Sequence, residues 1–185
     1  MSKSTRYEIR KSERLGIKTK IVKEISFVKE FFEHQLYLAR KHHFVPFEYE
    51  FLLKQFEQFL LDDQVAFINS YHQGALLASA FVIFYQQEAV YHYGVSTQEN
   101  SKLPGSYATQ WAAINEAKKR GCLIYNFWGV SPANDKKHRF AGPSLFKRGF
   151  GGDEVQHLWA HDLPTSPWYP AIKMFELVRK KVRRL

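Results

Sequence analysis

The sequence is poor in cysteine, with a single one, Cys122, in 185 residues. One cysteine excludes an internal disulfide and is typical of proteins from reducing compartments. No apolar run approaches the roughly 20 residues that a membrane-spanning helix needs. The first residues, Met1 to Arg6, contain no apolar signal-peptide core. We therefore expect a cytoplasmic protein without a membrane span.

The sequence also lacks the short motifs of several large enzyme classes. It has no Walker phosphate loop, no glycine fingerprint of a dinucleotide-binding fold and no nucleophile elbow. His157 and His161 lie on one expected strand without a third ligand nearby in the sequence, so no metal site is expected. Cys122 has no histidine or aspartate near it in the sequence, and we expect a buried, inert thiol.

Aromatic residues and positive charge are abundant instead. Phe, Trp and Tyr make up 16% of the chain, which supplies enough apolar area for the packed core of one domain. The formal net charge is +9, and the excess lies largely at the two ends. A basic surface attracts polyanions such as RNA, a nucleotide-linked substrate or an anionic membrane face. The same charges also serve as a solvated surface that aids solubility, so both interpretations stay open.

Hydrophobic spacing predicts one α/β domain over residues 1–185. Residues 1–14 are expected to form a basic arm, and the alternation over 17–22 predicts a strand. Helical spacing predicts a helix after Ser26, which we expect to cap it, ending at 42–43. A second helix is expected over 48–61, with these residues facing inward: Phe51, Leu52, Phe56, Phe59 and Leu60.

The middle of the chain changes to short apolar segments separated by turns. Strands over 65–71, 75–85 and 89–95 are joined by tight turns and predict an antiparallel meander. A helix over 106–120, followed by a strand over 123–128, predicts a crossover between parallel strands. The remaining expected elements are a short helix near 144–148, a strand near 154–161 and a helix from about 166.

The loop before the expected helix at Ser106 contains Lys102 and Gly105. A cation, a flexible glycine and free amides at a helix N-terminus favour an anion such as phosphate. The alternative is a serine-capped helix after a Pro-Gly turn. Further along, a strand ends in Trp128 and Gly129. Glycine after large aromatics permits close approach of a ligand, and Trp128 either lines a cleft or fills the core.

A glycine-rich stretch over 146–152 interleaves aromatic and basic residues. Lys147 and Arg148 can neutralise an oxyanion or a phosphate, and Phe146 or Phe150 can stack on a base. Its glycines permit unusual backbone angles and close approach. The alternative is a capped helical turn with a solvated basic edge.

Several spaced motifs, taken in order, resemble the FemAB/FemX family of aminoacyl-tRNA-dependent transferases, which add bridge amino acids to peptidoglycan precursors. The resemblance runs from about Tyr7 to Trp168 and rests on Tyr93-Gly94, Leu103-Pro104-Gly105, Gln110-Trp111-Ala112-Ala113-Ile114, Lys119-Arg120-Gly121-Cys122, Tyr125-Asn126-Phe127-Trp128-Gly129 and Phe146-Lys147-Arg148-Gly149-Phe150-Gly151-Gly152. It implies a GNAT (acyl-CoA N-acyltransferase-like) fold, with a mixed, mainly antiparallel sheet flanked by helices. Family members contain two such domains, and this chain resembles the second only.

The resemblance also implies site residues. Phe146 and Lys147 match a Phe-Lys pair in the transfer cleft, where the lysine assists charge development on the aminoacyl ester. Aminolysis of an ester passes through an oxyanion, which a fixed cation stabilises. Substrate-binding residues are expected at Tyr49, Tyr93, Lys102, Gly105, Trp128 and Arg148.

Two positions depart from the family pattern. Asn126 replaces an aspartate, so an acidic role is lost there. Val45 replaces an arginine of members that bind a nucleotide-sugar peptide.

Three functions are compatible with these features. The first is transfer of an amino acid from aminoacyl-tRNA to an amine, such as that of a peptidoglycan precursor peptide, without a cofactor. The second is acyl-CoA-dependent N-acyl transfer, in which the Lys102–Gly105 loop holds the pyrophosphate. The third is a non-catalytic half-protein that binds RNA or a partner transferase. A partner or a second copy (a homodimer) would then supply the missing first domain.

Overall fold

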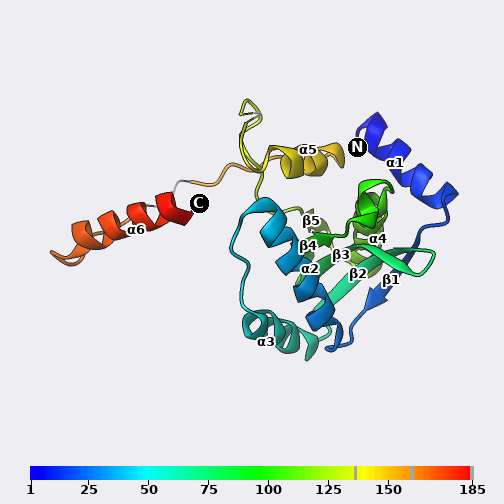
Figure 1. Cartoon of the computed structure of the whole chain (residues 1–185), viewed down its shortest axis with the longest axis horizontal. Helices are drawn as coiled ribbons and strands as arrows, with labels where there is room; N and C mark the ends of the chain where they lie inside the picture. The colour runs from blue at the N-terminus through cyan, green and yellow to red at the C-terminus, as the bar shows by residue number, and fades with distance from the viewer. Residues whose placement is uncertain (136, 159–160, 184–185) are drawn as a thin grey trace.

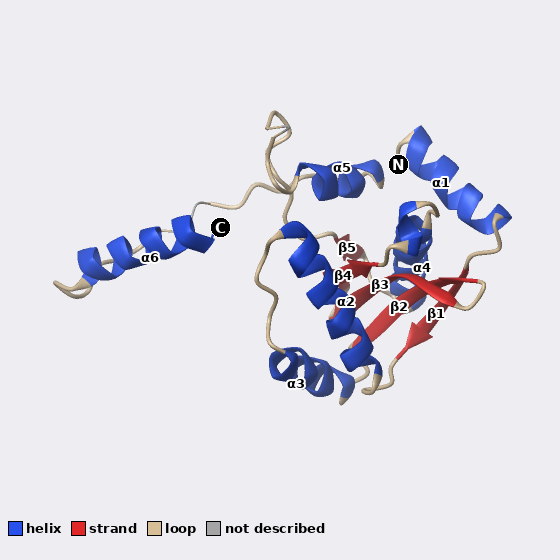
Figure 2. Cartoon of the chain, in the orientation of Figure 1, coloured by secondary structure: helices blue, strands red, loops and turns tan. Residues whose placement is uncertain are grey.

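The computed structural model describes residues 1–135, 137–158 and 161–183. Within these residues a five-stranded sheet in the order β1-β2-β3-β4-β5 has helices on both faces (Figures 1 and 2). The elements are α1 (Lys3–Arg14), β1 (Lys18–Val22), α2 (Phe27–His42), α3 (Tyr49–Leu60), β2 (Val65–His72), β3 (Ala75–Tyr85), β4 (Glu88–Ser96), the 3-10 helix η1 (Glu99–Ser101), α4 (Gly105–Lys119), β5 (Ile124–Asn126), α5 (Ala141–Gly149) and α6 (Tyr169–Arg183).

The sheet has the predicted topology. β1 to β4 pair antiparallel in sequence order, and β5 pairs parallel to β4 after the crossover through α4. The two faces of the sheet carry separate cores, because neighbouring residues of a strand point to opposite sides. Phe67 and Phe81 pack with Phe31 of α2 and Phe56 of α3 on one face. On the other face, alanines of α4 lie against small and branched residues of β2 and β3.

The N-terminal segment was expected to be a basic arm, and this expectation is wrong. It forms helix α1, which lies against α4 (Figure 1). Ser2 caps the helix, since its side chain accepts a hydrogen bond from the amide of Thr5 at 3.2 Å. Thr5, Ile9 and Ser12 form the buried face of α1. Two of these three residues are small and polar, so hydrophobic spacing did not reveal the helix.

Two further expectations fail on the helices α2 and α3. Phe51 does not face inward; it is 48% exposed and stacks on Phe47, with ring centroids 5.0 Å apart. Ser26 precedes α2 without a capping hydrogen bond from its side chain. Leu52 and Phe56 are the residues that α3 buries fully.

The C-terminal part also differs from the expectation. The strand expected near 154–161 is absent over 154–158 and at 161, while positions 159 and 160 lie outside the described residues. Figure 1 shows α6 standing away from the α/β body. Its apolar side chains are correspondingly exposed, including Phe175 at 66%. No helix of the described chain is long and apolar enough to cross a membrane.

Candidate active site

A β-bulge in β4 organises the centre of the candidate site. Phe81 of β3 faces Tyr93 and Val82 faces Tyr91, so His92 is the extra residue of the bulge. In a regular strand, residues 91 and 93 would share a face. Here Tyr91 packs with the core on the α4 side, and Tyr93 packs with the core on the α2 and α3 side. The bulge therefore leaves His92 without a partner on β3, outside the regular alternation of side chains between the two faces of the sheet.

The strands β4 and β5 separate next to this bulge. Their ladder pairs residues 88–90 with 124–126 and goes no further in the described chain. The chain after β5 then turns, because the side-chain Oδ1 of Asn126 accepts a hydrogen bond from the amide of Trp128 at 2.7 Å. Trp128 takes a left-handed backbone conformation, with φ of 66°. The ladder thus ends before His92 on β4 and Trp128 after β5, and we call the place between these two residues the opening.

Trp128 and Gly129 contact two residues at this opening, His92 and the candidate catalytic residue Lys147. The ring of Trp128 lies edge-on to that of His92, with centroids 5.8 Å apart. Trp128 is 58% exposed, so the core alternative for this residue is wrong. The backbone oxygen of Gly129 accepts a hydrogen bond from Nζ of Lys147 at 2.7 Å. Two consecutive residues of this turn therefore contact the imidazole of His92 and the ammonium of Lys147.

Phe146 belongs to an aromatic cluster that holds α5 on the body of the domain. Its ring lies 5.0 Å from that of Tyr107 on α4 and 5.3 Å from that of Phe150. Phe150 continues the cluster to Phe127, at 5.2 Å. At the amino end of the chain, the amide of Ser2 donates to the oxygen of Gly149 at 2.8 Å, so α1 also braces α5. These contacts fix the helix from which Lys147 projects.

Tyr93 links the bulge to the aromatic residues before α3. Its ring lies 4.0 Å from that of His92 and 5.6 Å from that of Phe47. Tyr49 sits on the same side of the sheet and packs on Phe32 at 5.6 Å. The structure therefore brings Tyr93 to the opening, with Tyr49 further along the same face.

Arg148 is engaged in contacts within the protein. Its guanidinium donates to both carboxylate oxygens of Glu154, at 2.5 and 3.0 Å, and to the backbone oxygen of Ser131 at 2.6 Å. The carboxylate of Glu154 raises the pKa of Arg148, chiefly through this hydrogen bond. Arg148 thus ties the segment after α5 to the loop before it, and a role in substrate binding stays a prediction.

Lys102 and Gly105 lie at the amino end of α4. Lys102 is exposed, whereas Gly105 is buried against β3. The alternative interpretation, a helix capped by Ser106, is wrong, because Asn100 takes that place. Its Oδ1 accepts from the amide of Ser106 at 3.0 Å, and its Nδ2 donates to the Ser106 hydroxyl. An amide expected to bind an anion is therefore already paired.

Burial controls the protonation of the groups around the opening. It lowers the pKa of the Lys147 ammonium and of the His92 imidazole, because a charged group loses hydration there. It raises the pKa of Tyr91 to about 12. Burial likewise raises the pKa of the Tyr93 phenol and of the half-buried Cys122 thiol. At neutral pH these two phenols and this thiol hold their protons.

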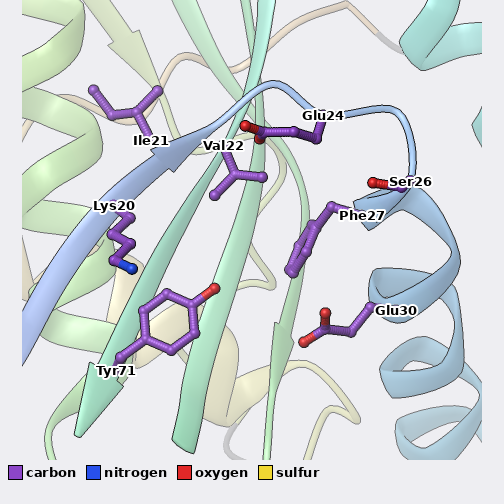
Figure 3. Close-up of a pocket in the computed structure, with 8 residues that line it drawn as sticks. All are labelled: Lys20, Ile21, Val22, Glu24, Ser26, Phe27, Glu30 and Tyr71. Carbon is purple, nitrogen blue, oxygen red and sulfur yellow. The ribbon is translucent and has the colours of Figure 1, made fainter. Parts of the chain in front are cut away.

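A separate hollow of about 420 Å³ lies between the end of β1 and the start of α2 (Figure 3). Its lining residues are Lys20, Ile21, Val22, Glu24, Ser26, Phe27, Glu30 and Tyr71. None of them was predicted as a site residue, and none belongs to the opening between β4 and β5.

The sequence interpretation missed His92, Asn100 and Asn126 as residues that shape the site. Asn126 had been noted only as a departure from the family pattern. It holds the turn at Trp128, and its Nδ2 also donates to Oε1 of Glu88 at 2.7 Å. The only sequence signal for His92 is its place between two tyrosines on an otherwise regular strand.

Comparisons with known proteins identify the family and the fold. A sequence model of the FemAB family matches residues 53–177. Aminoacyltransferase FemA of Staphylococcus epidermidis is 30% identical over 105 residues, which are 56% of this chain and 25% of the relative. FemA of Staphylococcus aureus is 29% identical over 107 residues, 57% of this chain and 26% of the relative. The chain therefore matches only about a quarter of the length of these curated relatives.

Solved structures share the fold. The crystal structure of FemX matches with a TM-score of 0.75 and 13% identity, over 81% of this chain and 54% of that chain. The aminoglycoside N-acetyltransferase AAC(6')-Iy in complex with CoA matches with a TM-score of 0.56 and 9% identity, over 80% of this chain and 94% of that chain. The predicted GNAT-type fold is confirmed.

Proposed function

We propose that the chain, which belongs to the FemAB family, transfers an amino acid from aminoacyl-tRNA to an amine acceptor, a peptidoglycan precursor peptide. The observation that supports this most is the placement of Lys147. Its ammonium lies beside the opening between β4 and β5, and the oxygen of Gly129 holds it at 2.7 Å.

Lys147 suits the step that aminolysis of an ester makes difficult. When the amine attacks the ester carbonyl, negative charge develops on the carbonyl oxygen, and a preorganised donor stabilises it. An ammonium has three N–H donors, and among the described residues only the Gly129 oxygen accepts from Lys147. The remaining donors are available for the oxyanion. Partial burial strengthens this interaction, because less water screens the charge.

The other site residues are proposed to bind and position the substrates. Phe146 keeps α5 in place through Tyr107 and Phe150, so it acts on Lys147 through packing. Trp128 and Tyr93 flank the opening and offer exposed or half-buried aromatic faces. The basic ends of the chain attract the tRNA backbone. Reactions of this kind place the protein in the cytoplasm, where charged tRNA is found.

Acyl transfer from acyl-CoA has less support from the local geometry. A pyrophosphate at the start of α4 needs free amides, yet Asn100 already binds the amide of Ser106. Leu77 of β3 occupies the space that a side chain at position 105 would need. A phosphate in this position would have to displace Asn100.

A transfer assay separates these functions. The protein is incubated with a set of tRNAs charged with labelled amino acids and with cell-wall precursor peptides, and in parallel with labelled acetyl-CoA and the same peptides. We expect label from tRNA, and not from acetyl-CoA, on the peptide amine. Transfer from acetyl-CoA alone would replace the proposal with the second function. Loss of both transfers, with a partner protein co-purifying in stoichiometric amount, would support a non-catalytic half-protein.

A further inference from the structure

His92 stands at the centre of the opening without an assigned role. It is the extra residue of the β4 bulge, next to the point where β4 and β5 separate. Its Nε2 is buried from solvent and has no hydrogen-bond partner among the residues that the structure describes. The rings recorded around it are those of Phe81, Tyr93 and Trp128, at 5.8, 4.0 and 5.8 Å.

A buried imidazole nitrogen without a partner is costly, since a buried polar atom normally forms a hydrogen bond. Such an orphaned atom in a site points to a missing partner that a ligand supplies. The aromatic surroundings also disfavour the imidazolium, and burial lowers the pKa of His92. A neutral imidazole has one ring nitrogen that accepts a proton.

The proposed reaction requires such an acceptor. An attacking amine loses a proton as its bond to the carbonyl carbon forms, so a base near the nucleophile accelerates the step. Among the described residues, the contacts also bring the Tyr93 phenol and the Lys147 side chain to the opening. Burial raises the pKa of Tyr93, so this phenol keeps its proton, and Lys147 acts as a hydrogen-bond donor to the Gly129 oxygen. Asn126 cannot serve, because its side chain is an amide.

We propose that His92 is the general base of the transfer reaction, an inference that rests on the proposed function. Nε2 of His92 accepts a proton from the attacking nitrogen while the new C–N bond forms at the ester carbonyl. The tetrahedral intermediate then collapses, the ester C–O bond breaks, and the imidazolium returns the proton to the leaving ribose oxygen. Each cycle thus restores the neutral imidazole.

The geometry divides the work between two residues that contact the same turn after β5. Lys147 binds the oxygen of Gly129 and stabilises the oxyanion, whereas His92 packs on the neighbouring Trp128 and moves the proton. Trp128 is largely exposed and lies edge-on to the imidazole, so an acceptor that reaches His92 also contacts this indole. This gives Trp128 a place in acceptor binding.

The test compares His92→Gln with the wild type in the tRNA-dependent transfer assay. Glutamine keeps a polar side chain of similar reach but takes up no proton. We expect kcat to fall by about 100-fold or more, within the range for loss of a general base, with KM little changed. His42→Gln is the matched control, because His42 is exposed at the end of α2; it should retain wild-type kcat.

The pH dependence gives a readout that a structural role would not move. Wild-type kcat should rise with pH through an apparent pKa below about 6.5, the ordinary histidine value, and His92→Gln should lose this limb. A wild-type profile without the limb overturns the assignment, even if His92→Gln fails to fold. A folded His92→Gln variant within threefold of wild type overturns it too, and leaves the proposed function standing. A wild type inactive with every charged tRNA overturns both.

Discussion

Replacing Gly105 with alanine tests whether this residue serves packing. Gly105 begins α4, and a Cβ added there would lie 2.4 Å from Cβ of Leu77 and 2.5 Å from Oδ1 of Asn100. Leu77 is fully buried on β3, so it has no room to move. Asn100 caps α4 through the amide of Ser106, so moving its side chain removes the cap.

The expected cost follows from these two contacts. Overpacking of a well-filled core costs about 1–3 kcal/mol, and loss of a helix cap costs about 1 kcal/mol. Gly105→Ala should therefore lower the free energy of unfolding by roughly 2–4 kcal/mol. At about 2–4 °C per kcal/mol for a chain of this size, the melting temperature falls by roughly 4–16 °C.

Gly142→Ala is the matched control for this measurement. Gly142 also lies near the start of a helix, α5, and an added Cβ would meet nothing within 4 Å. Its stability should stay unchanged or rise by up to about 1 kcal/mol, since alanine is the better helix former. The melting temperatures of both variants are measured by thermal unfolding followed by circular dichroism. Equal melting temperatures for Gly105→Ala and Gly142→Ala would refute the packing role.

Three further variants, with Phe175→Ala as a control, probe the core, the turn and the bulge. Phe56→Ala should lower the free energy of unfolding, measured with a denaturant, by about 3–5 kcal/mol. Phe175→Ala, on the exposed face of α6, should lower it by less than about 1 kcal/mol. Equal losses would contradict the burial of Phe56. Asn126→Asp removes the donor to Glu88 and brings two carboxylates, those of residues 126 and 88, next to each other. The free energy of unfolding at pH 7 should therefore fall by about 1–2 kcal/mol and recover as protonation sets in toward pH 4; a loss independent of pH would contradict this. Burial lowers the folded-state pKa of His92, so its contribution to stability is present above the unfolded value of about 6.5 and is lost as pH falls through the folded value. In His92→Phe, the melting temperature should therefore fall less steeply as the pH is lowered. An unchanged slope would contradict the burial of the imidazole.

The sheet and its crossover were predictable because their signals are local. Short apolar segments at β2 and β3, separated by turns at Gly74 and at 86–87, predict a meander without knowledge of the tertiary fold. Helix α1 was not predictable in the same way. Its buried face contains Thr5 and Ser12, and these small polar residues are buried by tertiary packing, in which α1 lies against α4 and Thr5 lies beside Gly149 of α5.

The candidate site shows the same division between local and tertiary signals. Lys147 and Phe146 were predicted from a motif contiguous in the sequence, although their catalytic role stays a prediction. His92 was missed because a bulge is a property of the pairing between β3 and β4, and nothing local marks it. Gly105 was interpreted as part of an anion-binding loop, because the sequence does not reveal that Leu77 fills the space beside it.

The most direct test of the proposed function is the single-turnover rate of transfer from charged tRNA by Lys147→Met, at saturating acceptor. Methionine keeps much of the length of lysine but removes the ammonium that the Gly129 oxygen holds. Loss of one oxyanion donor predicts a rate about 100- to 1000-fold below that of the wild type, while the melting temperature stays close to the wild-type value. A folded Lys147→Met protein that transfers the amino acid at the wild-type rate would contradict the account.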